Sequence, residues 1–160
     1  MIDWSCHIIL GYPDEKLLVE TYSEKPDNLR SVNQSLSWIR DLPIFLNIEI
    51  KMSNSTRVPF VQLAVWESAA LKKKQEMQWN PSIPTPAISV QGHDWKLYLF
   101  FEDTHDLVAL GPMSLGNTSN TRAIWALMYR LHIIVQWGQT EYTQWFMKEV
   151  LGKQPIATGA

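Results

Sequence analysis

"IFLNIEIK", residues 44–51, reads as a β-strand in which apolar and polar residues alternate. Successive side chains of a strand point to opposite faces, so residues two apart share a face. One face carries Ile44, Leu46, Ile48 and Ile50, and the other carries Phe45, Asn47, Glu49 and Lys51. The pair Glu49 and Lys51 has two interpretations. It is either a weak ion pair on a solvated edge strand, or half of an active site with a carboxylate for a metal and an amine beside it.

The segments around this strand predict a small sheet flanked by helices. Apolar residues after residue 57 recur at helical spacing and predict a stripe made of Val58, Val61, Val65, Trp66, Ala69 and Ala70. Residues 14–42 are polar and irregular. The expected elements are strands at 2–10 and 44–51, a helix at 58–74, a loop at 78–86, a strand meander over 87–110, and helices at 121–136 and 140–151. Asn117 or Ser119 is the expected N-cap of the helix at 121–136, and Gly152 the C-cap of the last helix.

Length and composition indicate one globular domain. A chain of 160 residues that is 46% hydrophobic and 19% charged can bury a core, and we assign it to a single domain over 1–152 with a frayed tail at 153–160. No apolar run approaches the ~18 residues that a membrane-spanning helix needs. The start "MIDWSCHIIL" lacks the positive region of a signal peptide, and Cys6 has no partner for an internal disulfide. We therefore expect an intracellular, cytoplasmic protein.

The charge balance argues against a nucleic acid as the preferred partner. The formal net charge is −2, and the only basic run is Lys72-Lys73-Lys74. Eight tryptophans are unusually many. We expect Trp66, Trp95, Trp125 and Trp137 in the core, while other tryptophans are available to line a pocket for a flat apolar ligand.

Four blocks of sequence resemble the PD-(D/E)xK nuclease-like domain widespread in filamentous fungi. They are "LPIFLNIEIK", "VQLAVWESAAL", "PAISVQGHDWKLYLFF" and "GPMSLGNTSNTRAIW", and the resemblance runs from residue 2 to about residue 145. It implies an α/β fold, with a mixed central β-sheet flanked by helices and the family's first helix missing.

The resemblance also assigns site residues. It makes Asp3 the first acid of the motif, Glu49 and Lys51 its (D/E)xK, and Gln62 a ligand-orienting residue on the next helix. Asp27 is the alternative first acid, because it follows a literal proline. Asp3 and Glu49 would hold Mg²⁺ if the protein acts as a nuclease, and Lys51 would steady the nucleophile or the developing charge. His93 is a weaker candidate for acid–base work.

Three functions remain open from the sequence. The first is an Mg²⁺-dependent DNA endonuclease with a nuclear location. The second, which the resemblance implies, is a repurposed enzyme of fungal secondary metabolism. It would use the same residues and a tryptophan-rich pocket for cyclisation, isomerisation or hydrolysis of a small apolar metabolite. The third is a catalytically silent binding module. The charge and the tryptophan content favour the second by a small margin; the oligomeric state is left open, with a homo-oligomer among the alternatives.

Overall fold

The structure is a computed structural model that describes residues 4–9, 43–80, 82–104 and 106–152, with the backbone alone described for 4–9. Within these ranges, no helix combines the length and the apolar character that a membrane span requires.

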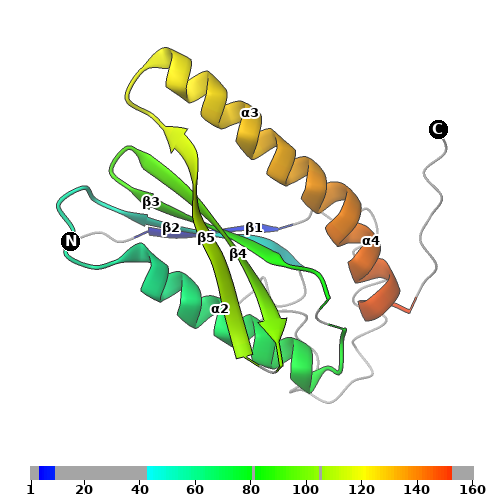
Figure 1. Cartoon of the computed structure of the whole chain (residues 1–160). Helices are drawn as coiled ribbons and strands as arrows, with labels where there is room; N and C mark the ends of the chain where they lie inside the picture. The colour runs from blue at the N-terminus through cyan, green and yellow to red at the C-terminus, as the bar shows by residue number, and fades with distance from the viewer. Residues whose placement is uncertain (1–3, 10–42, 81, 105, 153–160) are drawn as a thin grey trace, which may run out of the picture.

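A five-stranded mixed sheet forms the centre of the fold (Figure 1). The strands lie side by side in chain order: β1 (Trp4–Ile9), β2 (Ile44–Lys51), β3 (Thr85–Gln91), β4 (Asp94–Asp103) and β5 (Asp106–Asn117). Only β2 and β3 are parallel, and the other neighbours are antiparallel. Parallel neighbours need a crossover connection, which helix α2 (Pro59–Glu76) supplies. The predicted α/β fold with a mixed central sheet is confirmed.

Helix α2 packs on one face of the sheet, and α3 (Thr121–Trp137) packs on the other. The helical path continues after α3 through the π-helical turn η2 (Gly138–Tyr142), the short α4 (Thr143–Trp145) and the π-helical turn η3 (Phe146–Val150). The break expected before residue 140 is therefore wrong. The N-cap of α3 is Asn120, whose Oδ1 accepts a 3.0 Å hydrogen bond from the Ala123 N–H. The N-caps expected for α3 are wrong, because β5 runs on to Asn117 and α3 begins only after Asn120. Gly152 follows the last helical turn with a φ of +63°.

The larger core lies between the sheet and the C-terminal helical segment. Its buried members come from β2, β3, β5, α3 and the turns that follow α3, and they include Leu46, Ile48, Ile88, Val90, Leu115, Leu127 and Phe146. A smaller cluster under α2 contains Leu63, Ala87, Tyr98 and Phe100. The larger core packs directly on β2, an interior strand of the sheet, through Leu46 and Ile48.

The predicted buried stripe of α2 is wrong. Val58, Val61 and Val65 are each about 60% exposed, whereas Leu63 and Glu67 are buried against the sheet. Apolar residues lie on most sides of this helix, so the sequence pattern allowed more than one rotation about its axis. The predicted loop at 78–86 also ends earlier than expected, because β3 already begins at Thr85.

Candidate active site around Glu49 and Lys51

Glu49 and Lys51 form a buried ion pair on β2, an interior strand of the sheet. Their side chains lie on the same side of β2, and the distance from Lys51 Nζ to Glu49 Oε1 is 2.6 Å. Glu49 is 1% exposed and Lys51 is 6% exposed. β2 is flanked by β1 on one side and β3 on the other, so the alternative of a solvated edge strand is wrong. A buried, charge-assisted pair of this kind has a defined geometry that an exposed pair lacks.

The sheet residues beside the pair are polar. Ser89 on β3 lies directly opposite Glu49, and Lys96 on β4 lies directly opposite Ser89. Residues opposite one another in a sheet share a face, so these three side chains form a row across three strands. Gln91 occupies the same position opposite Lys51. Ser89 is buried and Lys96 is exposed, so the row leads from the ion pair to the surface.

Two hydrogen bonds fix the end of β2 where the pair lies. The Gly92 N–H donates to the Lys51 carbonyl at 3.0 Å, and Gln91 Nε2 donates to the Ser55 carbonyl at 3.3 Å. The first bond extends the β2–β3 pairing into the β3–β4 turn. The second ties β3 to the loop that leads from β2 into α2. The pair therefore lies on a rigid strand end, as a preorganised site requires.

Helix α2 contributes a buried acid, Glu67, that the sequence did not single out. Asn47 Nδ2 donates a 2.6 Å hydrogen bond to Glu67 Oε1, and Asn47 is two residues before Glu49 on the same face of β2. Burial raises the pKa of Glu67 to about 7, against the opposing effects of the Asn47 hydrogen bond and the attraction of Lys74. The sequence offered no signal for it, because the predicted stripe of this helix did not include Leu63, the buried residue one turn before Glu67.

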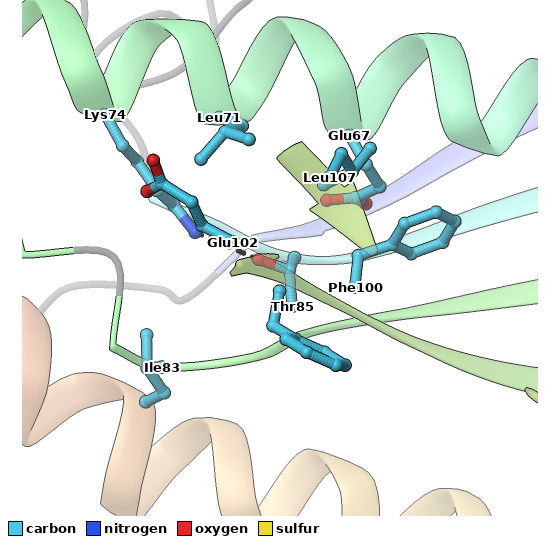
Figure 2. Close-up of a pocket in the computed structure, with 9 residues that line it drawn as sticks. Glu67, Leu71, Lys74, Ile83, Thr85, Phe100, Glu102 and Leu107 are labelled. Carbon is cyan, nitrogen blue, oxygen red and sulfur yellow. Dashed lines mark hydrogen bonds between the residues drawn. The ribbon is translucent and has the colours of Figure 1, made fainter. Parts of the chain in front are cut away.

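The third lysine of the basic run points into the protein. Lys74 Nζ donates a 2.9 Å hydrogen bond to Thr85 Oγ1 and lies 5.4 Å from the centre of the Trp145 ring. Figure 2 shows Lys74, Glu67, Thr85 and Glu102 around one small hollow under α2. Burial lowers the pKa of Lys74, and the attraction of Glu67 and Glu102 partly offsets that effect.

A model of the PD-(D/E)XK nuclease superfamily matches residues 1–143. The chain belongs to this superfamily. No curated protein and no solved structure matches the chain. The match identifies the superfamily and does not extend to a fungal subgroup, so that part of the expected resemblance stays an expectation.

The structure brings together two of the residues predicted for this PD-(D/E)XK member, Glu49 and Lys51. Gln62 is exposed on α2, one residue before the buried Leu63. His93 is exposed in the β3–β4 turn, where its Nδ1 lies 3.0 Å from Thr118 Oγ1. The roles assigned to Gln62 and His93 stay predictions. The two alternative first acids, Asp3 and Asp27, lie outside the described residues.

Among the described residues, Glu49 is the candidate ligand for a divalent cation. Within the described ranges, no three His, Cys, Asp or Glu side chains gather closely enough to hold a metal ion. The Glu49 carboxylate is nevertheless the type of ligand that Mg²⁺ takes, and Mg²⁺ commonly uses one or two carboxylates together with waters and substrate phosphates. Glu49 therefore fits as one protein ligand of a divalent cation, with Asp3 as the predicted second.

The tryptophan-rich pocket stays a prediction, because the side chains of Trp4 and Trp38 lie outside the described residues. Trp79 and Trp145 are buried in the core on the α3 side, and Trp95 and Trp137 pack against it. Trp125 is 73% exposed, so its prediction as a core residue is wrong. Trp66 is half-buried on α2.

Proposed function

We propose that this PD-(D/E)XK protein is a divalent-metal-dependent hydrolase of phosphodiesters, with a nucleic acid as the substrate class. The observation that carries the proposal is the buried 2.6 Å pair of Glu49 and Lys51 on one face of β2. A phosphodiester develops negative charge as water attacks it, and a fixed cation beside a metal-binding carboxylate stabilises that charge without reorganisation. This substrate class implies a nuclear or cytoplasmic location, which agrees with the single cysteine of the chain.

Each residue then has a defined role. Glu49, together with Asp3 as the resemblance implies, would hold Mg²⁺, which when bound polarises the phosphate and lowers the pKa of an attacking water. Lys51 places its ammonium group beside the reacting phosphate. Glu49 in turn restrains that ammonium group through the ion pair, so the cation is already oriented before the substrate binds.

The polar surroundings of the pair support a phosphate over an apolar metabolite. Its neighbours across the sheet are Ser89, Gln91 and Lys96, which supply hydrogen-bond donors and a cation. A flat apolar ligand would find few complementary side chains here.

A second candidate, acid–base chemistry on a small fungal secondary metabolite, is favoured by a different observation. The net charge is −2, and Lys74 turns its ammonium group inward, so the basic run presents fewer than three ammonium groups to a nucleic-acid backbone. Cyclisation, isomerisation or hydrolysis of a small molecule needs no such basic surface. A catalytically silent binding module is the third candidate.

Calorimetry and cleavage assays separate the three candidates. Mg²⁺ and Mn²⁺ are titrated into the wild-type chain, Glu49→Gln and the control Glu76→Gln, whose residue is exposed on α2. Supercoiled plasmid and single-stranded oligonucleotides are then incubated with each protein and metal. We expect metal binding and cleavage in the wild type and the control, and neither in Glu49→Gln.

The other outcomes identify the alternatives. A wild-type protein that binds no metal and cleaves no nucleic acid, but converts a small molecule in a Lys51-dependent manner, supports the second candidate. Ligand binding without turnover supports the third. Melting temperatures of all variants show whether a lost activity reflects lost folding.

A further inference from the structure

Helix α3 presents a largely apolar side to solvent, on which His132 is also exposed. Its apolar members are Ile124, Trp125, Met128, Tyr129 and Ile133, here called the α3 aromatic face. Trp125 is 73% exposed, Tyr129 68% and Met128 56%. Spacings of three and four residues place these side chains on one side of the helix, opposite the buried Leu127. In Figure 1, no other labelled element lies over the outer side of α3.

We propose that the α3 aromatic face is the interface of a homodimer, in which α3 packs antiparallel against α3 of a second copy about a two-fold axis near Met128. The inference is independent of the catalytic proposal, because none of these residues belongs to the candidate site. A two-fold interface uses the same patch on both copies, so one self-complementary face is sufficient.

The area of the face matches the lower range of specific dimers. The exposed fractions of its five residues correspond to on the order of 600 Å² of accessible surface, since a fully exposed aromatic side chain contributes ~150–250 Å². Specific interfaces bury about 600–1,000 Å² per partner. Tryptophan, tyrosine and methionine are also the residue types enriched in such interfaces. The composition and the area therefore fit a weak but specific dimer.

The charges on α3 favour the antiparallel arrangement. The helix carries Arg122 and Arg130 but no acidic residue. Arg130 donates a 2.7 Å hydrogen bond to the Leu115 carbonyl, so it is held against its own sheet. In a parallel pair the two Arg122 side chains would meet. In an antiparallel pair centred on Met128 they lie ~18 Å apart along the helix axis, beyond the ~8–10 Å range of unscreened repulsion.

Sedimentation velocity at about 1–500 µM protein tests the dimer, because interfaces of this size typically give micromolar affinity. We expect a concentration-dependent monomer–dimer equilibrium. Trp125→Glu should raise the dimer Kd at least ~10-fold, since a central tryptophan is a common hot spot. The matched control is Val61→Glu, because Val61 is also apolar, helical and 61% exposed, but lies on α2. The control should leave the Kd within about two-fold of the wild-type value.

Cross-linking tests the geometry of the dimer. Met128→Cys, next to the proposed axis, should give a disulfide-linked dimer under mild oxidation, whereas Ser68→Cys, exposed on α2, should give no more than the parent chain. A wild-type protein that stays monomeric up to 500 µM overturns the proposal, even if it binds lipid vesicles or another protein through α3. A dimer that Trp125→Glu and Val61→Glu weaken equally, or that Ser68→Cys cross-links as well as Met128→Cys, also overturns it. Unchanged melting temperatures of the monomers confirm that the variants remain folded.

Discussion

The amide group of Asn47 donates a 2.6 Å hydrogen bond to the carboxyl group of Glu67, and this bond joins the strand of the candidate site to the helix that follows it. Asn47 is 2% exposed and so is Glu67. A buried polar group without a partner is costly, so the bond stabilises both residues. The bond fixes the rotation of α2 about its axis where the helix lies over β2. Its strand partner, Asn47, is two residues before Glu49.

The raised pKa of Glu67 makes stability depend on pH. An unfolded glutamate titrates near 4.5, and the folded one near 7. Between these values the folded state holds a proton that the unfolded state releases, so the free energy of unfolding should fall as pH rises from about 5 to 7.5. The contribution is at most about 3 kcal/mol. Urea unfolding of the wild type and Glu67→Gln from pH 5 to 8 measures it.

Glu67→Gln should lack this fall and be more stable than the wild type at pH 8, because glutamine can still accept the Asn47 hydrogen bond and carries no buried charge. Glu76→Gln is the control, since Glu76 is exposed on the same helix. Parallel pH profiles for the wild type and Glu67→Gln would show that the carboxyl group is not desolvated in the folded state.

Lys51→Met should lower both stability and activity. The substitution keeps most of the side-chain volume but removes the cation bound to a buried carboxylate, which typically costs ~3–5 kcal/mol of unfolding free energy. The double variant Glu49→Gln/Lys51→Met should recover much of that loss. If the proposed function holds, turnover of Lys51→Met falls by ~10²–10³. Denaturant unfolding, and turnover at a temperature where the variant is folded, measure the two effects.

Lys72→Met is the control for Lys51→Met, because Lys72 is exposed on α2. This substitution should change the free energy of unfolding by less than ~0.5 kcal/mol. Equal effects of Lys51→Met and Lys72→Met on stability would contradict the buried pair. Full turnover in a folded Lys51→Met protein would remove Lys51 from the catalytic machinery.

Gly138→Ala should destabilise the protein, although alanine is the better helix former. A Cβ atom at this buried position would collide with the ring of Phe45, which is itself only 1% exposed. Overpacking of this kind costs ~1–3 kcal/mol. Thermal unfolding measures the loss, with the exposed neighbour variant Gln139→Ala as the control. A higher melting temperature for Gly138→Ala would mean that Phe45 moves aside at little cost.

Alanine substitutions at one buried and one exposed position test the rotation of α2 about its axis. Leu63→Ala should cost ~2–5 kcal/mol, because Leu63 is 1% exposed in the cluster with Tyr98 and Phe100. Val61→Ala should change the unfolding free energy by less than ~0.5 kcal/mol, because Val61 is 61% exposed. Denaturant unfolding measures both losses. A larger loss for Val61→Ala than for Leu63→Ala would mean that the helix buries the side that the sequence pattern predicted.

Local signals predicted several elements well. The strand at 44–51 has the bounds expected from its alternation and from the preceding Pro43, and the helix expected at 121–136 ends one residue later than predicted. Predictions whose outcome depends on residues distant in the sequence were wrong. Asn117 was expected to cap a helix but ends a strand, because pairing with β4 extends β5 across a segment rich in glycine and turn residues. Trp125 was expected in the core on residue type alone, whereas the rotation of α3 decides its exposure.

The sequence by itself determined that Glu49 and Lys51 share one face of a strand, because alternation of side chains is a property of the local backbone. Only the tertiary structure decided that the pair is buried. Strands β1 and β3 come from distant parts of the chain and flank β2, which removes the pair from an exposed edge. Glu67 likewise became part of this region only through the packing of α2. Burial depends on which segments meet across the sheet, and no local pattern of residues specifies that.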